Sequence, residues 1–266
     1  MTPPHKPKIS VALCGFLGRM GNSIIEVSKT YDDLYIKAGI DQKERISQAN
    51  TQLELVSSDL KDVIDKVDLV IEFTGNVDAA LKNAQICKDH QKPIVIGTTG
   101  FEQNHLDSLK DISGHIPVVF SPNMSLGVNM LFKLLEIALK ALKDKGYDVE
   151  ISEIHHRFKK DAPSGTALRL LDIIKKEISN THEVFGREGI SPREENEVGV
   201  FALRGGDVVG EHTVYMFGMG ERLELTHRAT DRRIFAKGSL ESAKWVYEKS
   251  KTSSKGFYSM FDVLGL

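Results

Sequence analysis

Residues 153–167 bring together the side chains of this chain that are best suited to acid–base chemistry. They read Glu-Ile-His-His-Arg-Phe-Lys-Lys-Asp-Ala-Pro-Ser-Gly-Thr-Ala. An imidazole titrates near neutral pH and is therefore a good general acid there. Lys159 adds a compact positive charge four residues after the first histidine. The segment predicts a site that donates a proton and holds an anion.

The same segment indicates how its side chains are arranged. Neighbouring residues of a strand point to opposite faces, so at most one of His155 and His156 needs to face the chemistry. The other histidine is then left to orient the first or to bind substrate. Ser164-Gly165-Thr166 is typical of a helix start with Ser164 as N-cap, and it offers hydroxyls and backbone N–H groups to a carboxylate. We therefore expect a small dicarboxylate as substrate.

A metal site is the alternative interpretation of this segment. Glu153, His155, His156 and Asp161 are all possible ligands. Their spacing, however, is unlike the His-x-x-x-His helical spacing of zinc hydrolases. Three cationic side chains at positions 157–160 would also repel a divalent ion. We expect no metal here.

Two polar groups further along the chain allow two interpretations. Arg204-Gly205-Gly206-Asp207 is either a hairpin turn or part of a shared pocket, and His212 is either an ordinary strand histidine or a second member of that pocket. The sequence does not favour one reading over the other.

A glycine-rich turn near the N-terminus indicates a dinucleotide cofactor. Gly15-Phe16-Leu17-Gly18-Arg19-Met20-Gly21 follows an apolar run and precedes an amphipathic one. Glycines in this place permit a tight turn, and the following helix offers its N-terminal N–H groups to a pyrophosphate. The match to Gly-x-Gly-x-x-Gly is incomplete because Leu17 occupies the middle position.

Residues at the ends of later strands strengthen the cofactor prediction. Asp41 follows the second expected strand about 20 residues after the glycines, where an acid binds the ribose hydroxyls. Residues 97–100 and 121–123 end two further strands, at the edge where ligands gather in such sheets. Asp41 should repel a 2′-phosphate, Gln42 supplies no cation for it, and Lys43 remains a candidate. We expect NADH to be favoured and NADPH to be tolerated.

Up to about residue 125, short apolar runs alternate with amphipathic segments. We expect strands at 8–13, 35–40, 67–73, 93–96 and 117–120, and helices at 20–29, 77–90 and 102–110. Strands that alternate with helices are typical of a parallel α/β sheet with right-handed crossovers. The pattern predicts a Rossmann-like dinucleotide-binding domain.

The pattern changes after residue 125. We expect a helix at 128–143, a strand at 147–155, a helix from 164 to about 179, a charged loop at 181–197, strands at 198–204, 208–217 and 222–226, and a last helix at 235–248. The turns at 205–207 and 218–220 are interpreted as links between consecutive antiparallel strands. The fold class is therefore α/β, with an α+β substrate domain that has a mixed, largely antiparallel sheet. Residues 126–234 form that domain, and 1–125 with 235–266 form the dinucleotide-binding domain.

Composition limits the class of protein. The 266 residues are 41% hydrophobic and 27% charged, as expected for a packed core. A net charge of −2 gives no basic field for nucleic acid, and no apolar run approaches the roughly 20 residues of a membrane span.

Cys14 and Cys87 lack metal-ligand spacing and are expected to be free, buried thiols. Residues 1–8 lack the apolar stretch of a signal peptide, so we expect a cytoplasmic protein.

Over nearly its whole length, the sequence resembles the 4-hydroxy-tetrahydrodipicolinate reductase (dihydrodipicolinate reductase) family of the bacterial lysine and diaminopimelate pathway. The segments that carry the resemblance are 15–21 with its Gly-Arg-Met-Gly ending, 72–74, 97–100, 121–125, 155–167, 204–214 and 226–229. The segment around the histidine pair is the most specific of them.

The resemblance implies an oxidoreductase that reduces 4-hydroxy-tetrahydrodipicolinate, a cyclic dicarboxylate, to tetrahydrodipicolinate. Hydride passes from NADH or NADPH to C4, and the 4-hydroxyl leaves as water. It implies His155 as proton donor and Lys159 as the residue that binds substrate and stabilises developing negative charge. His156, Gly165 and Thr166 would hold the substrate carboxylates. The residues implied for the cofactor are Gly15, Phe16, Leu17, Gly18, Arg19, Met20, Asp41, Gln42, Gly97, Thr98, Thr99, Ser121, Pro122, Asn123 and Met124.

The resemblance further implies a homotetramer built through the sheet of the substrate domain. Where some members carry an arginine beside the acidic ribose ligand, this chain has Gln42, which again favours NADH. Two alternatives remain at this point. One is another two-domain NAD(P)-dependent dehydrogenase of aspartate-derived substrates, and the other is a dinucleotide-binding sensor that has lost catalysis. Neither is expected to combine the histidine pair with Lys159 and the Ser-Gly-Thr helix start.

Overall fold

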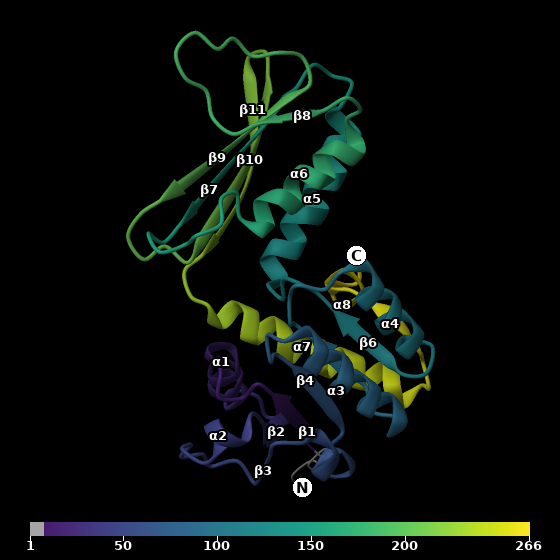
Figure 1. The fold of residues 1–266 in the computed structure, drawn as a ribbon. Helices are drawn as coiled ribbons and strands as arrows, with labels where there is room; N and C mark the ends of the chain where they lie inside the picture. Colours follow the sequence, from purple (N-terminus) through teal and green to yellow (C-terminus); the bar gives the residue numbers. More distant parts are fainter. Residues whose placement is uncertain (1–7) are drawn as a thin grey trace, which may run out of the picture. The chain divides into compact units, whose positions relative to one another are not determined.

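The computed structural model describes residues 8–266, which form two compact units (Figure 1). One unit consists of the chain up to Leu126 together with Arg233–Leu266, and the other of Gly127–Arg232. The expectation of no signal peptide rested on residues 1–8, and all of these except Lys8 lie outside the described residues.

The first unit contains a seven-stranded sheet in which all neighbouring strands are parallel. Its order, β3-β2-β1-β4-β5-β6-β12, is the Rossmann order with one strand added. From β1 the strand order runs outward through β2 and β3 on one side, and from β4 it runs outward through β5 and β6 on the other. The loops that follow β1 and β4 therefore lead away from each other and leave room for a ligand between them. The strands are β1 (Ile9–Cys14), β2 (Leu34–Ile40), β3 (Leu55–Ser57), β4 (Leu69–Glu72), β5 (Ile94–Ile96), β6 (Pro117–Phe120) and β12 (Gly256–Tyr258).

Helices cover both faces of this sheet (Figure 1). Ala12 and Cys14 of β1 belong to an apolar cluster with α3 and α4, and Val11 and Leu13 to a second cluster with α1 and α7. A strand buried on both faces needs a mainly apolar run. The polar residue of β1, Ser10, is satisfied because its N–H and its hydroxyl both donate to the carboxylate of Asp68 (2.7 and 2.6 Å). The helices are α1 (Arg19–Ser28), α2 (Lys43–Ile46), α3 (Val77–Asp89), α4 (Gln103–Ser113), α7 (Arg233–Lys251) and α8 (Met260–Leu264), with 3₁₀ turns at Leu60–Asp62 and Ile64–Lys66.

The second unit contains a five-stranded mixed sheet of order β11-β10-β7-β9-β8. β10 is antiparallel to both β11 and β7, whereas β9 is parallel to both β7 and β8. The two helices lie along one face of the sheet (Figure 1). The elements are α5 (Leu126–Leu142), β7 (Asp148–His155), α6 (Gly165–Glu177), β8 (His182–Val184), β9 (Glu197–Arg204), β10 (Gly210–Gly218) and β11 (Glu221–Ala229).

One predicted strand pairing is wrong. β9 and β10 are consecutive in the chain, but β7 lies between them, so residues 205–207 do not form a hairpin turn. The N–H of Gly205 donates to the carbonyl of His155 (3.0 Å), and the N–H of Arg157 donates to the carbonyl of Gly206 (3.2 Å). These bonds carry the loop across the end of β7. The turn at 218–220, in contrast, does link two paired strands, β10 and β11.

Both cysteines are free and buried, as predicted. Burial is the main reason that the pKa of each thiol, Cys14 and Cys87, is raised well above its usual value. These thiols are therefore unreactive core residues. Within residues 8–266, no helix has the length and apolar character needed to cross a membrane.

Candidate active site

The glycine-rich turn joins β1 to α1 and has the close packing that a dinucleotide turn requires. Gly15 has a φ of +81°, and a Cβ built on it would lie 2.4 Å from the carbonyl oxygen of Phe73. Only glycine fits there without moving the backbone. Gly18 precedes α1, and no side chain caps that helix. The turn thus presents helix N–H groups of the kind that bind pyrophosphate.

Most of the predicted cofactor residues line two cavities in this unit. The larger cavity, about 520 Å³, lies at the carboxyl ends of β1, β4, β5 and β6. The predicted residues around it are Gly18, Arg19, Met20, Gly97, Thr98, Thr99, Pro122, Asn123 and Met124. Phe73, Gly75 and Phe235 complete the lining and were not predicted. The loops that the sequence analysis assigned to the cofactor therefore do meet.

The second cavity, about 300 Å³, is lined by Gly15, Asp41 and Gln42. The carboxylate of Asp41 is almost buried, and it accepts hydrogen bonds from the backbone N–H groups of Leu17 (3.0 Å) and Gln42 (2.9 Å). It also pairs with the guanidinium of Arg45 (2.8 Å), which lines the same cavity. Arg45 was not predicted, because Asp41 lies before the N-cap of the short helix α2 and the i to i+4 spacing of helical ion pairs therefore gave no signal.

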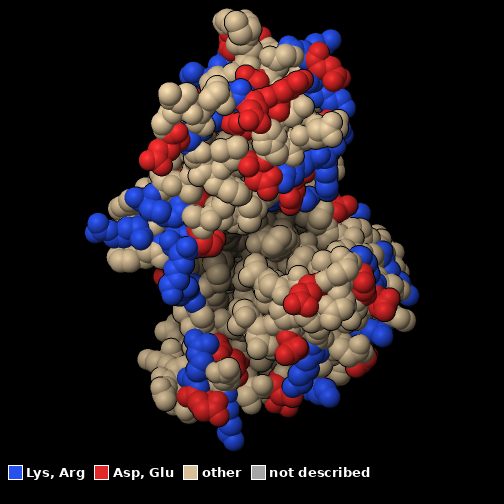
Figure 2. Space-filling view, turned by 45° about the horizontal axis from the view of Figure 1, so that its top comes forward, with Lys and Arg blue, Asp and Glu red and all other residues tan. Residues whose placement is uncertain are grey.

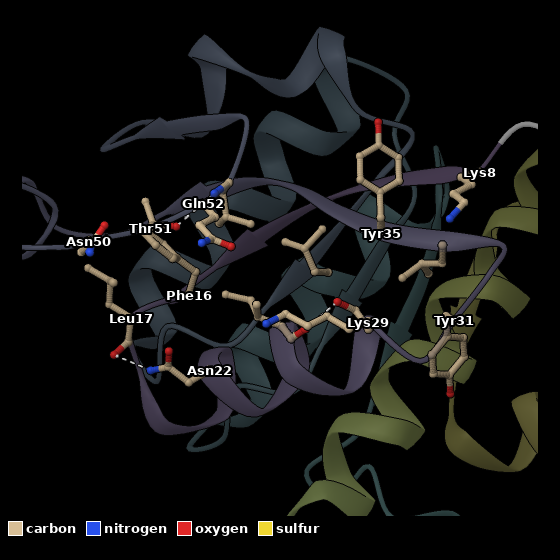
Figure 3. A pocket seen from close by; sticks show the side chains of 15 residues that line it. Lys8, Phe16, Leu17, Asn22, Lys29, Tyr31, Tyr35, Asn50, Thr51 and Gln52 are labelled. Carbon is tan, nitrogen blue, oxygen red and sulfur yellow. Dashed lines mark hydrogen bonds between the residues drawn. The ribbon is translucent and has the colours of Figure 1, made fainter.

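Three predicted cofactor residues lie outside these two cavities. Phe16 is fully buried, and with Leu17 it lines a third cavity of about 550 Å³ between α1 and residues 50–53 (Figure 3). The structure therefore does not bring these two side chains into the cavities that the other predicted cofactor residues line. Ser121 is buried, and its hydroxyl donates to the carbonyl of Asn123 (2.7 Å), so it shapes the turn after β6.

In the second unit, His155 ends β7 and shares the inner face of that strand with Glu153. The carboxylate of Glu153 is completely buried and hydrogen-bonds to Nδ1 of His155. It also accepts from the backbone N–H of Ser164 (2.9 Å) and from the guanidinium of Arg204 (3.0 Å). A buried carboxylate with three donors is a stable anion beside the imidazole.

A second imidazole, that of His212 on β10, packs edge-on against His155, with ring centroids 5.1 Å apart. Its Nε2 lies 2.9 Å from the hydroxyl oxygen of Ser164, which in turn accepts from the N–H of Ala167 and caps α6, as predicted. Burial, with a contribution from His155, lowers the pKa of His212 to about 4. His212 is therefore neutral at neutral pH. Arg204 and His212 thus both contact the pair of Glu153 and His155, and the hairpin turn expected at residues 205–207 is absent.

His156 and Lys159 lie on the irregular segment that follows β7. Nε2 of His156 is 3.4 Å from the guanidinium of Arg232, a residue that the sequence analysis did not identify. Lys159 is largely buried and pairs with Asp161 (2.9 Å). Gly165 and Thr166 are the first residues of α6. The acid, the cations and the helix start predicted from residues 153–167 thus belong to one unit.

Glu153, His155 and His212 also form a group whose ligand atoms all lie within 4.8 Å of one another, a spacing that a metal ion could bridge. The guanidinium of Arg204 already lies 3.0 Å from Glu153, and the other partners of the group are donors and hydroxyls of the protein. These hydrogen bonds account for the arrangement of the three side chains, and the arginine would oppose a divalent cation.

A parallel Rossmann sheet with a dinucleotide edge, and a unit that carries an imidazole beside cations, together define a two-domain dinucleotide-dependent oxidoreductase. Comparison with known proteins gives the family. Residues 9–124 match the family model "Dihydrodipicolinate reductase, N-terminus" and residues 127–264 match "Dihydrodipicolinate reductase, C-terminus". The chain belongs to the 4-hydroxy-tetrahydrodipicolinate reductase family, whose members are oxidoreductases of lysine biosynthesis.

Two curated relatives and one solved structure illustrate the match. The 4-hydroxy-tetrahydrodipicolinate reductase of Aquifex aeolicus is 51% identical over 97% of this chain and 99% of its own length. That of Archaeoglobus fulgidus is 42% identical over 96% and 99%. The dipicolinate-bound dihydrodipicolinate reductase of Paenisporosarcina sp. TG-14 has a TM-score of 0.78 at 22% identity, with 96% of this chain and 98% of that chain covered, and shows the same fold. The family and the fold class predicted from the sequence are confirmed.

Proposed function

We propose that this chain reduces 4-hydroxy-tetrahydrodipicolinate to tetrahydrodipicolinate with NAD(P)H. The observation that carries the proposal is the buried pair of Glu153 and His155, which is bonded to the start of α6 and is followed four residues later by Lys159. The curated relatives that match almost the whole chain carry the name of this activity.

In the proposed reaction, residues of the first unit bind the cofactor, and residues of the second unit bind the substrate and donate the proton. A reduced nicotinamide supplies a hydride for C4 when it is bound at the glycine-rich edge. The reaction consumes one hydride and one proton and releases one water. His155 donates the proton, and Lys159 binds the substrate and stabilises the negative charge that develops on it. His156, Gly165 and Thr166 hold the substrate carboxylates, through the imidazole and the N-terminus of α6.

The direct test is oxidation of NADH followed by absorbance, with the substrate generated in the cuvette from pyruvate and aspartate semialdehyde. The proposal expects oxidation that depends on both precursors and on the enzyme that condenses them. Folded protein that binds NADH but does not oxidise it under these conditions would instead favour a sensor or a different substrate.

We also propose that NADH is preferred and NADPH accepted. Asp41 supplies the carboxylate that suits free ribose hydroxyls, and Gln42 beside it carries no charge. Arg45 partly neutralises Asp41, and Lys82 lines the same cavity, where it pairs with Asp59. We therefore expect Arg45 and Lys82, in place of Lys43, to be the cations that contact a 2′-phosphate.

Arg45→Ala is expected to lower kcat/KM for NADPH by about tenfold while changing that for NADH by less than about threefold. The guanidinium would bond a 2′-phosphate by charge-assisted hydrogen bonds, and its loss also leaves the Asp41 charge unmasked. Steady-state kinetics with both cofactors measures the ratio. Lys43→Ala, a neighbouring cation of α2 that lines neither cavity, is the matched control. Equal losses with both cofactors would refute the role of Arg45.

We propose that the assembly is a homotetramer built through the sheet of the second unit. The helices α5 and α6 cover one face of that sheet (Figure 1). On the other face lie the side chains of Phe201, Leu203, Tyr215 and Phe217, of which Leu203 is 50% exposed and Phe217 36%. The guanidiniums of Arg187 and Arg222 lie over the rings of Phe201 and Phe217 and border this apolar patch. Tyr215 and Phe217 stack with centroids 5.7 Å apart. An apolar patch of this kind is typical of a subunit interface.

Leu203→Glu is expected to shift the protein from tetramer to smaller species at micromolar concentration, because it places charge within this apolar surface. Native mass spectrometry or light scattering measures the mass. Ile137→Glu on α5, a residue that is 57% exposed, is the control and should leave the assembly intact. A monomeric wild-type protein, or a Leu203→Glu variant that remains tetrameric, would contradict the proposal.

We propose no metal and no nucleic-acid partner for this reaction, and the cytoplasm as its location. The net charge is −2, and acidic and basic side chains both occur across the face shown in Figure 2. The substrate is a small dianion, for which the cations named above are sufficient.

A further inference from the structure

The side chain of Glu153 hydrogen-bonds to His155, to the start of α6 and to Arg204, but it has no assigned step in the proposed reaction. It lies on β7, two residues before His155, so both side chains point to the same face of the strand. Its exposure is 0%. Burial of a carboxylate costs free energy because the charge loses its hydration. Hydrogen bonds from neighbouring groups must offset that cost at this position.

All partners of Glu153 are donors from different elements. Oε1 accepts from the N–H of Ser164 at the start of α6 and from the guanidinium of Arg204 at the end of β9. Arg204 is held in turn by the carbonyls of Asp161 (2.7 Å) and Leu203 (2.8 Å). Oε2 is left for Nδ1 of His155. The carboxylate therefore has a fixed orientation, and its free oxygen faces the imidazole.

The charge on Glu153 determines which nitrogen of His155 carries a proton. Burial by itself raises the pKa of this carboxyl, but hydrogen bonds from His155, Arg204 and Ser164 outweigh it and lower the pKa to about 2. An ionised carboxylate only accepts hydrogen bonds. Nδ1 of His155 must then be the donor, in the neutral as well as in the protonated imidazole.

The opposite side of the ring is fixed by packing. A Cβ built on Gly210 of β10 would lie 2.9 Å from Nε2 of His155 and 3.2 Å from its Cδ2, so the ring occupies space that any larger residue would take. The ring of His212 packs against it at an interplanar angle of 73°. The imidazole is thus confined on several sides, with Nδ1 committed to Glu153.

We propose that Glu153 is the positioning residue of the proton donor: it holds His155 with Nδ1–H toward the carboxylate, so that Nε2 is the nitrogen that gives the proton to the substrate. The inference rests on the proposed function and deepens it. As imidazolium, His155 would give its Nε2 proton to the hydroxyl oxygen that leaves C4 as water, and a reduced nicotinamide, when bound, would supply the hydride that replaces this hydroxyl. The N–H bond at Nε2 breaks, and its electron pair stays on the nitrogen. The neutral Nδ1–H tautomer remains bonded to Glu153.

The first test is the tautomer of His155 in the wild-type protein, which does not depend on turnover. Two-bond ¹H–¹⁵N correlation of labelled histidine rings separates the two neutral tautomers, and the His155→Gln variant identifies the signals of His155. We expect a proton on Nδ1 at every pH at which the protein is folded and active. A neutral His155 with its proton on Nε2 and a bare Nδ1 would overturn the proposal, whether or not the chain is a reductase.

The second test is Glu153→Gln, which removes the charge at nearly constant size. We expect kcat to fall at least about tenfold, with KM for NADH unchanged within about twofold and the tautomers of His155 mixed. Glu150→Gln is the matched control, because Glu150 lies on the same strand and also pairs with arginines, Arg187 and Arg193, but contacts no part of the site. It should leave kcat and the tautomer of His155 unchanged.

A folded Glu153→Gln variant with wild-type kcat and tautomer would overturn the proposal. If that variant does not fold, Glu153→Asp is measured in its place, with the same two outcomes.

Discussion

Replacement of His155 by alanine is expected to lower kcat by roughly 10²- to 10⁴-fold, the usual contribution of a general acid. KM for NADH should change little, because the cofactor residues belong to the other unit. The expected loss is large because His155 is the imidazole that is paired with a buried carboxylate. Burial lowers the pKa of His212 to about 4, so that His212 is a neutral imidazole and a poor acid at neutral pH. Steady-state and single-turnover kinetics on the purified variant measure the effect.

The alanine variant leaves the carboxylate of Glu153 with one donor fewer, so its folding must be checked by thermal unfolding. His155→Gln keeps an amide N–H near that carboxylate and serves as the second variant. His182→Ala is the control, because His182 is a half-exposed histidine of β8 that pairs with Glu194. A folded His155 variant with unchanged kcat would remove the proton donor from this account.

Lys159→Ala is expected to raise KM for the dicarboxylate and to lower kcat, with a combined loss in kcat/KM of roughly 10- to 100-fold. The basis is the strength of charge-assisted hydrogen bonds, together with the double role of the lysine in binding and in stabilising developing charge. Since its partner Asp161 is well exposed, stability should hardly change. Full kinetics in both substrates separates the two effects.

The neighbouring cation Lys160 is exposed and provides the matched control for Lys159. Lys160→Ala should reproduce wild-type kinetics within about twofold, as expected for an exposed charge that is screened by solvent. If Lys159→Ala behaves like Lys160→Ala, the lysine does not act in the site. If both variants lose activity equally, a general field of positive charge, and not one positioned group, binds the substrate.

The parallel sheet could be predicted because its strands are buried on both faces. β1 and β4 appear in the sequence as short, mainly apolar runs that are each followed by a helical segment, and their shortness favours buried strands over helices. Of the strands of three residues, β5 was predicted because it is a fully apolar, buried run, whereas β3, β8 and β12 are only partly buried or exposed and were missed. They exist because a neighbouring strand offers them hydrogen bonds.

The wrong pairing of β9 with β10 has the same physical origin. Strands that follow one another in the sequence usually pair as a hairpin. Here β7 pairs with both of them, through one edge with β9 in parallel and through the other edge with β10 in antiparallel orientation. The insertion of β7 between two strands that are consecutive in the sequence depends on contacts between residues far apart in the chain. A local sequence pattern does not predict such contacts.

The candidate site could be predicted where its residues are close in sequence, and not where they meet only in the fold. Residues 153–167 form one continuous signal. Arg204 reaches Glu153 across 51 positions, and Arg232 reaches His156 across 76. Arg45 was missed for another reason, since an exposed-looking cation on a short helix does not indicate that it pairs with a buried acid. Composition and spacing identify the chemistry, while the fold determines which charges are paired.

The central claim is that this chain delivers a hydride to C4 of a cyclic dicarboxylate. The measurement that tests it most directly is mass spectrometry of the product formed with NADH deuterated at the transferred position of the nicotinamide. We predict tetrahydrodipicolinate that carries one deuterium at C4, with one NADH oxidised and one water lost per product molecule. A product that retains the 4-hydroxyl, or deuterium found elsewhere than at C4, would contradict the account.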